Sequence, residues 1–412
     1  MERVVVTGVG TVNPIGKSAA ETWDNAVNGV SGVGPITLFD SSDLLVHIAC
    51  EVKEFDPTHY MEAREARRQD RFEQFGVAAA KEAVEQAGLT IQPENAARVA
   101  VIISSAVGGL ETLEHGVTEI STQGPRRVSP FIIPMYMSNG AAGLVAIHYG
   151  AKGPALSIAS ACASGADGIG QAWMLIRAGV VDSAIAGGAD AAINKIGVSG
   201  FDRLAAVSRR NDDYSMTPAP FDKDRDGLVM AEGAAVLVLE SLGHARARGA
   251  EILGELVGYS STSDAFHITA PAEDGAGGAA AIAAAMRMAG IRTDQVDYIN
   301  AHGTATGLND VSETRAIKAA LGEAAYDTPI SSTKSMTGHM MGATGALEAI
   351  FCVLAIRDGV VPPTIHFRTP DPDCDLDYVP NEARRLPVQV ALSNAFGFGG
   401  HNAVLAFRAF SG

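Results

Sequence analysis

Cys162 lies where an apolar run gives way to a helix-forming run. Small residues flank the thiol throughout 157–166, and Trp173 and Ile176 follow it at helical spacing. A thiol at the start of a helix faces unpaired backbone amides and the positive end of the helix dipole, which favour a thiolate and can hold an oxyanion. We therefore expect a nucleophile with room beside it for a substrate. The alternative is a small buried core residue, which is common for a lone cysteine.

Two histidines each follow a predicted strand in a segment rich in Gly, Ser and Thr. His302 lies within 300–307, and His339 ends the segment 332–339. Sites of α/β proteins gather at the carboxyl ends of strands. Taken singly, each histidine is more often a satisfied structural residue. Taken with Cys162, they indicate one active site.

Lys334 and Phe398 stand out because of their neighbours. Lys334 comes shortly before His339, and Glu348 follows on the next predicted helix, so the two charges could pair in the interior. Phe398 lies between glycines, which let the backbone bend close to a ligand. The simpler interpretations are an exposed lysine and a glycine-rich bulge between two strands.

Short runs of Val, Ile and Ala alternate with longer Ala-rich segments of helical period, which predicts an α/β fold with buried sheets. The predicted strands are 4–6, 99–104, 184–186, 234–240, 298–301 and 403–407. The predicted helices are 71–87, 163–178, 277–289, 310–321 and 344–357. Several of these helices contain so much Ala and Gly that we expect sheets to pack on both of their faces.

The chain shows no internal repeat and no linker rich in Pro or Ser. Charged residues in 208–213 and 221–227 predict a long loop, which is either a solvated excursion or part of the site. A short predicted helix at 242–249 ends in Ala-Arg-Gly, and we expect it to connect two halves of the chain. We expect residues 1–250 to carry the cysteine and residues 251–412 to carry both histidines.

The composition restricts the class of function. With 31 Lys and Arg against 47 Asp and Glu, the formal net charge is -16, which disfavours a nucleic-acid partner. The four cysteines form no CxxC pair, which argues against a zinc site and a disulfide framework and suits a reducing cytoplasm. The first residues predict a strand rather than a signal peptide, and no uninterrupted apolar run of about 20 residues predicts a membrane span.

Four motifs together resemble one family, the elongating type II β-ketoacyl-[acyl-carrier-protein] synthases of the thiolase-like superfamily. The motifs are residues 161–165, 302–307, 334–339 and 397–400, and the likeness extends over essentially the whole chain. The resemblance implies a five-layered α-β-α-β-α fold of two similar halves and a homodimer. It also implies fatty acid elongation, in which an acyl group on the enzyme condenses with malonyl-ACP to give 3-oxoacyl-ACP and carbon dioxide.

The resemblance assigns catalytic roles by motif. Cys162 would accept the acyl group, and the amides of Cys162 and Phe398 would hold the thioester oxygen. His302 and His339 would hold the malonyl carbonyl through neutral imidazole N–H groups. Donors placed on that oxygen lower the barrier because negative charge develops there when carbon dioxide leaves.

Other positions take supporting roles in the resemblance. Lys334 would organise the charges of the site with help from Glu348. Thr304 and Thr306 match positions that bind the phosphopantetheine arm, whose amides their hydroxyls can reach. Phe398 also matches the gating aromatic residue of the acyl pocket. No metal and no separate cofactor are expected, because the substrates travel on the phosphopantetheine of acyl carrier protein.

Val107 and Phe201 resemble acyl-pocket positions, although a plain core role fits them equally well. The carrier protein is acidic in this family, so an acidic enzyme must concentrate cations where the carrier docks. The docking candidates are Arg64, Arg67, Arg68, Arg126 and Arg127. The alternative for these arginines is a solvated helix face.

Other members of the superfamily fit the motifs less well. A thiolase would carry a second catalytic cysteine where this chain has Phe-Gly-Gly-His at 398–401. The initiating synthases use Cys-His-Asn, whereas this chain presents His339, and a non-catalytic chain-length factor would lack Cys162. A type II polyketide ketosynthase shares Cys-His-His and remains the alternative. His401, where many fatty acid synthases have Thr, blurs the subfamily.

Overall fold

The computed structural model describes residues 2–412 and contains a run of ten hydrogen-bonded strands in the order β10-β9-β13-β14-β8-β1-β7-β6-β4-β5. These strands are β1 (Val4–Val12), β4 (Val99–Ser104), β5 (Ala155–Leu156), β6 (Ser183–Ala191), β7 (Glu232–Ser241), β8 (Gly254–Ser263), β9 (Tyr298–Asn300), β10 (Ile330–Ser331), β13 (Val390–Gly397) and β14 (His401–Arg408). Two short ribbons pair β2 (Gly34–Pro35) with β3 (Ile48–Ala49) and β11 (Val360–Val361) with β12 (Arg384–Arg385).

The ten strands form two sheets of the same design. In β5-β4-β6-β7-β1 and in β10-β9-β13-β14-β8, the first two neighbouring pairs in the order given are parallel and the last two pairs are antiparallel. The sheets meet only where residues 4–6 of β1 pair with residues 254–256 of β8. The chain therefore contains a structural repeat, although no repeat is apparent in the sequence.

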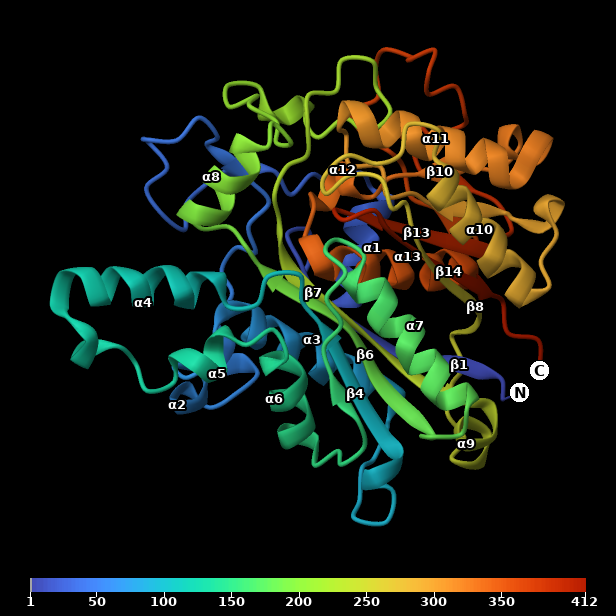
Figure 1. Cartoon of the computed structure of the whole chain (residues 1–412). Helices are drawn as coiled ribbons and strands as arrows, with labels where there is room; N and C mark the ends of the chain where they lie inside the picture. Colours follow the sequence, from blue (N-terminus) through green and yellow to red (C-terminus); the bar gives the residue numbers. More distant parts are fainter. Residues whose placement is uncertain (1) are drawn as a thin grey trace.

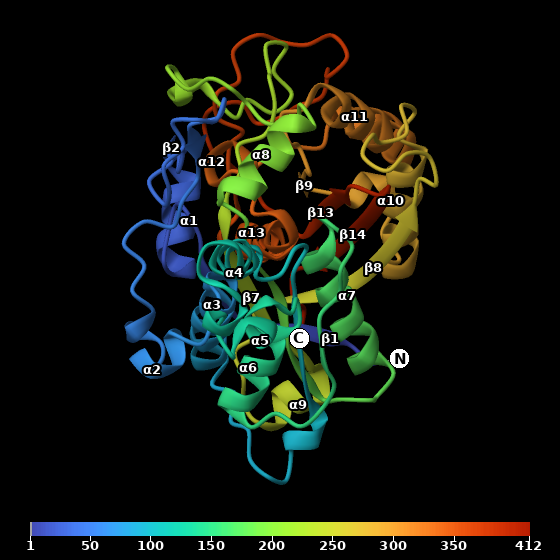
Figure 2. The same ribbon diagram turned by 60° about the vertical axis from the view of Figure 1, so that its left-hand side comes forward.

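Helices separate and cover the two sheets. They are α1 (Ala19–Val27), α2 (Ala63–Ala66), α3 (Arg71–Ala87), α4 (Leu110–Gln123), α5 (Ile132–Tyr136), α6 (Gly140–Tyr149), α7 (Ser164–Arg177), α8 (Lys195–Arg203), α9 (Leu242–Ala247), α10 (Ala276–Ala289), α11 (Gly307–Leu321), α12 (Lys334–Thr337) and α13 (Thr344–Asp358). Helices α3 and α6 pack on the first sheet, α10 packs on the second sheet with α11 beside it, and α7 and α13 lie between the sheets (Figures 1 and 2). This arrangement confirms the expected five layers.

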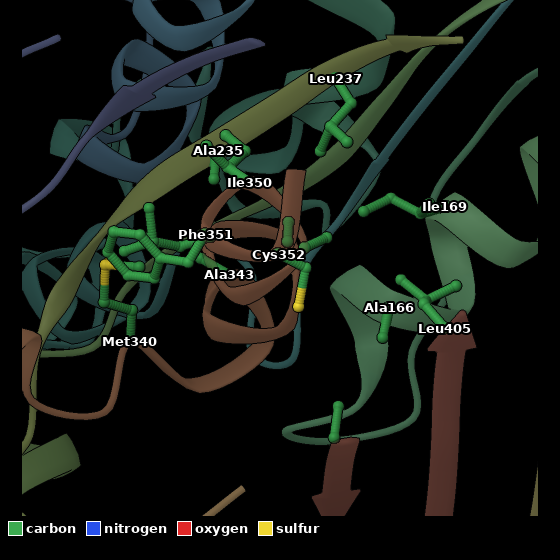
Figure 3. Packing of buried hydrophobic residues seen from close by; sticks show 14 of the residues in the cluster. Ala166, Ile169, Ala235, Leu237, Met340, Ala343, Ile350, Phe351, Cys352 and Leu405 are labelled. Carbon is green, nitrogen blue, oxygen red and sulfur yellow. The ribbon is translucent and has the colours of Figure 1, made fainter. Parts of the chain in front are cut away.

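The middle layer is deeply buried along α13. Every residue of α13 from 344 to 355 is buried. Figure 3 shows Phe351 of α13 in one hydrophobic cluster with Leu237 of β7, in the first sheet, and Leu405 of β14, in the second. The expectation that helices rich in small residues pack between sheets is confirmed for α13 and α7, whereas α10 is partly exposed.

Glycine makes the close approach of the two central segments possible. A Cβ atom added to Gly165, in the first turn of α7, would lie 2.5 Å from the carbonyl oxygen of Gly342, just before α13. Neighbouring backbone cannot retreat from such a contact as a flexible side chain could. The start of α7 and the start of α13 are therefore held against each other, and both adjoin the site.

Most predicted elements exist, and their ends differ by small shifts. Helix 71–87 and strand 99–104 agree with α3 and β4, while 4–6 and 184–186 are parts of longer strands. Strands β8 and β13 were missed, because polar residues such as Ser393 interrupt their apolar pattern although the strands lie inside the sheet. Helices α1, α4, α6 and α8 were also missed.

The predicted long loop is confirmed between α8 and β7, where only a 3-10 turn, Tyr214–Met216, interrupts it. Its middle packs against the second half of the chain. The rings of Phe221 and Tyr378 stack with centroids 3.9 Å apart, and Arg225 Nη1 donates a hydrogen bond of 2.5 Å to Asp371. The loop is therefore docked and is not a solvated excursion.

The expected division after residue 250 falls between α9 and β8, and the independence of the two halves remains a prediction. Within residues 2–412, no helix combines the length and the apolar character needed to cross a membrane.

Candidate active site

Cys162 lies in a tight turn directly before α7. Ala161 has a φ of +51°, a left-handed conformation that is unusual for a residue with a side chain. The Ser164 hydroxyl stabilises this turn, because it accepts a hydrogen bond from the Ser160 amide (3.0 Å) and donates one to the Ala161 carbonyl (2.6 Å). The thiol is thereby held at the N-terminal end of α7, as predicted, and it is only 8% exposed.

Burial decides the charge of the thiol. It raises the pKa of Cys162 to about 11, although the positive charge of Lys334 and the backbone amides of Phe398 and Cys162 lower it. The amides at the helix end therefore act in the expected direction, but the loss of hydration outweighs them and the thiol is neutral at rest. These two amides lie close enough to the thiol to lower its pKa, and their role in holding an oxyanion stays a prediction.

The glycine-rich segment reaches the Cys162 turn through close backbone contact. A Cβ atom added to Gly397 would lie 2.9 Å from the Ser160 carbonyl oxygen and 3.0 Å from the Cys162 amide nitrogen. The ring of Phe398 stacks on that of Phe201 with centroids 6.1 Å apart. A bulkier residue at 397 would move the Phe398 amide away from the sulfur.

His302 and His339 lie face to edge, with ring centroids 5.5 Å apart and an interplanar angle of 84°. Both are buried. Burial, together with the nearby charge of Lys334, holds the pKa of each imidazole well below its usual value. Both rings are therefore neutral at physiological pH, which is the protonation state expected of two N–H donors.

The surrounding backbone fixes each histidine. The amides of His302 and Gly303 donate hydrogen bonds of 2.8 and 2.7 Å to the two carboxylate oxygens of Glu313, on α11. His339 Nδ1 lies 3.0 Å from the Thr344 hydroxyl, and when that hydroxyl donates, the ring proton is on Nε2. The sequence analysis did not single out Glu313 or Thr344. The available signal was that each polar residue lies on the helix that follows one of the two histidine motifs.

Lys334 and Glu348 form the predicted interior pair. Lys334 Nζ lies 2.5 Å from Glu348 Oε1, and both side chains are almost fully buried. Burial raises the pKa of Glu348 to about 8, and the charge of Lys334 opposes that rise. The pair supplies the positive charge that lowers the pKa of both histidines and of the thiol.

Several buried oxygen atoms behind this pair have no hydrogen-bond partner among the described residues. They are Asn300 Oδ1, Glu348 Oε2, Ser393 Oγ and Asn394 Oδ1. Oxygen-only groups of this kind suit a hard cation or an ordered water. In residues 2–412, no three His, Cys, Asp or Glu side chains gather as a metal site, and the expected absence of a metal stays a prediction.

A cavity of about 250 Å³ joins the reactive side chains. Of the residues predicted from the sequence, its lining includes Cys162, His302, His339, Phe398, Phe201, Thr304 and Thr306. The hydroxyls of Thr304 and Thr306 lie 3.0 Å apart. Val107 does not line this cavity and packs against the main core cluster instead.

The five candidate docking arginines lie outside the cavity and are exposed. None forms a salt bridge with another residue in 2–412. The Arg68 guanidinium lies 4.5 Å from the ring centroid of Phe131, close in sequence to Arg126 and Arg127. Arg64 lies on α2 and is followed by Arg67 and Arg68, whereas Arg126 and Arg127 lie in the 3-10 turn after α4.

Comparisons with known proteins agree with this geometry. The β-ketoacyl synthase N-terminal domain matches residues 1–245, and the C-terminal domain of the same family matches residues 253–368. A 3-oxoacyl-[acyl-carrier-protein] synthase 2 of Synechocystis sp. is 51% identical over 409 residues, which are 99% of this chain and 98% of that protein. A protein of the same name from Staphylococcus aureus is 50% identical over 99% of both chains.

Solved structures resemble the chain over its full length. A ketosynthase of a type II polyketide synthase, in complex with its acyl-carrier protein, superposes with a TM-score of 0.91 at 36% identity, covering 100% of both chains. A β-ketoacyl synthase from Burkholderia phymatum gives 0.92 at 34% identity, also over 100% of both chains. The fold is thus that of the thiolase-like ketosynthases.

The chain belongs to the β-ketoacyl synthase family of acyltransferases.

Proposed function

We propose that this enzyme is a 3-oxoacyl-[acyl-carrier-protein] synthase that elongates fatty acids. The observation that carries the proposal is one cavity containing a buried thiol and two neutral imidazoles. Cys162 Sγ attacks the thioester carbonyl of acyl-ACP. The C–S bond to the phosphopantetheine breaks, and its sulfur leaves with the proton of Cys162.

The second half-reaction uses the histidines. Malonyl-ACP loses carbon dioxide, and His302 and His339 donate N–H groups to the thioester oxygen on which negative charge develops. The enolate carbon attacks the acyl carbonyl on Cys162, a C–C bond forms, and the C–S bond to Cys162 breaks. A neutral ring suits this task, because it stabilises the oxyanion without protonating the enolate beforehand.

A type II polyketide ketosynthase is the second candidate, and identity disfavours it. The two 3-oxoacyl-[acyl-carrier-protein] synthases named above are 50–51% identical to this chain, whereas the type II polyketide ketosynthase is 36% identical. Both candidates use the same chemistry, so a comparison of carrier proteins and acyl lengths separates them. The preferred acyl length is an outcome of that experiment.

Acyl carrier protein is the proposed partner. The unpaired arginines near Arg68 offer an acidic carrier a positive surface on an enzyme of net charge -16. No separate cofactor takes part. Thr304 and Thr306, at the cavity wall, are the proposed contacts for the phosphopantetheine arm.

We also propose a cytoplasmic homodimer. Strand β5 is an unpaired sheet edge, and its Leu156 is 43% exposed. Ile133 on α5 and Ile147 on α6 are 63% and 78% exposed. An apolar surface beside an open strand edge is suited to a second copy of the chain. The four cysteines are free, which suits a reducing compartment.

The Cys162→Ala variant tests the acyl-transfer step. Purified enzyme is incubated with acyl-ACP and examined by intact mass, and malonyl-ACP is then added while carbon dioxide and 3-oxoacyl-ACP are measured. Wild type should gain one acyl group, and the variant should gain none and form no condensation product. A variant that still acylates and condenses would exclude Cys162 as the nucleophile.

The His302→Ala variant tests the second step. Acyl transfer to Cys162 should remain, while release of carbon dioxide from malonyl-ACP should fall by about 10²-fold or more, the usual effect of losing one oxyanion donor. Intact mass and carbon dioxide release measure the two steps separately. Unchanged decarboxylation would reject the role.

A further inference from the structure

Asp190 is a fully buried carboxylate that the proposed reaction does not use. It lies near the end of β6 and is 0% exposed. Its two oxygens accept hydrogen bonds from the Ser105 hydroxyl (2.5 Å) and from the amides of Ala106 (3.0 Å), Val107 (3.4 Å) and Gly342 (2.7 Å). A single side chain thus meets four donors from two separate segments.

The first of these segments follows β4 and leads to Val107, which packs against the core beside the site. The second is the 3-10 turn Met341–Ala343, which lies between His339 and Thr344. Since His339 Nδ1 contacts the Thr344 hydroxyl, a shift of this turn would move both residues of that pair. Asp190 therefore ties the turn after His339 to the segment that follows β4.

The same turn also touches the segment that carries the nucleophile. The carbonyl oxygen of Gly342 would lie 2.5 Å from a Cβ atom at Gly165 and 2.6 Å from one at Gly188. Gly165 is three residues after Cys162, and Gly188 belongs to the strand that carries Asp190. The position of Gly342 consequently sets how the His339 turn sits against the Cys162 turn.

We propose that Asp190 is a positioning residue for the condensation: its carboxylate fixes the turn after His339 against the Cys162 turn and so sets the placement of the His339 donor relative to the acylated cysteine. The inference rests on the proposed function of that site. Asp190 does not line the cavity, so it acts on the His339 donor through Gly342, and its charge also raises the pKa of Cys162.

A carboxylate is the required chemistry because all four partners are donors. An amide of the same shape offers one acceptor oxygen and turns an NH₂ group toward an N–H or hydroxyl donor. Asn at this position would leave at least one buried donor unpaired and push one of the two segments away. Burial raises the pKa of Asp190 to about 6, while these hydrogen bonds oppose that rise, so the group is mainly ionised at neutral pH.

The Asp190→Asn variant, in the full chain, tests the proposal. Acyl transfer from acyl-ACP should stay within about twofold of wild type, because it needs only Cys162 and the two amides. Decarboxylation of malonyl-ACP by the acylated enzyme should fall by about tenfold or more, because small misplacements of a catalytic group are costly. The first step is followed by intact mass and the second by carbon dioxide release.

Two further variants keep the result decisive. Asp297→Asn is the matched control, since Asp297 accepts hydrogen bonds from the amides of Gln389 and Val390 at the opposite end of β9 from His302; both steps should match wild type. Ser105→Ala removes one donor to Asp190 and should give a smaller loss, again confined to decarboxylation. If Asp190→Asn does not fold, the Ser105→Ala variant provides the test of the positioning role.

Equal losses in both steps would mean that Asp190 serves stability alone, and an unaltered decarboxylation rate would mean that it does not position His339. Either result overturns the proposal. If wild-type enzyme catalyses neither step with acyl-ACP and malonyl-ACP, the proposed function fails instead, so the two failures are distinguishable.

Discussion

Cys162, His302 and His339 share a cavity, and burial shifts the pKa of each side chain in the direction that favours its neutral form. A neutral imidazole is the useful form for an oxyanion donor. A neutral thiol is the less reactive form, so ionisation of Cys162 must accompany attack on the substrate. The charge of Lys334 lowers the pKa of all three groups, so it opposes the effect of burial at Cys162 and reinforces it at the two histidines.

The pKa of about 11 for Cys162 predicts how alkylation depends on pH. Below that value the thiolate fraction rises about tenfold for each pH unit, so the rate of carbamidomethylation should keep rising from pH 7 to pH 9. Intact mass with iodoacetamide measures it, and Cys162→Ala reports any reaction of the other three cysteines, which are buried. A rate already constant near pH 7 would contradict the raised pKa.

At the scale of elements, the site depends on how closely the starts of α7 and α13 approach each other. Small residues permit that approach, and Gly165 meets the backbone of Gly342 with no room for a methyl group. The two helices also lie between the sheets, so neither can move outward without opening the core (Figure 1). A change in the packing of the middle layer would therefore also change the geometry of the site.

The Gly165→Ala substitution should lower the free energy of unfolding by about 1–3 kcal/mol, the usual effect of overpacking a core. Gly200→Ala is the matched control, because Gly200 lies inside α8 with nothing within 4 Å of an added Cβ. It should be neutral or stabilise the protein by up to about 1 kcal/mol. Urea unfolding measures both, and equal stabilities of the two variants would contradict the close contact.

At the scale of the whole molecule, the two sheets repeat one design but share a single middle layer. Both tryptophans belong to the first half and bond to the second. Trp173 Nε1 donates to the Leu256 carbonyl and Trp23 Nε1 donates to Asp358, each at 2.7 Å. The halves are thus coupled through buried contacts as well as through β1 and β8.

This coupling predicts that the halves unfold together. Tryptophan fluorescence and far-UV circular dichroism should give one coincident transition in urea. Trp23→Phe and Trp173→Phe, each leaving one reporter, should give the same agreement between the two probes. Two separated transitions would show that residues 1–250 and 251–412 are independent folding units.

From the sequence alone, the reactive residue types and several of the regular elements could be predicted. Cys162, His302 and His339 each follow a predicted strand. The length of each strand and the small residues beside each reactive side chain are local properties that can be read from the sequence. Helix α3 was predicted with its observed bounds, and the structure shows that Asp70 and Glu73 form a capping box at its start.

Only the tertiary structure decided the charge states, the duplication and the supporting carboxylates. A pKa depends on what covers a group, and the atoms that bury Cys162 come from distant parts of the chain. Strands β8 and β13 carry polar residues that interrupt their apolar pattern, which hid the repeat. Glu313 and Asp190 look like ordinary acidic residues until folding brings several backbone amides to each of them.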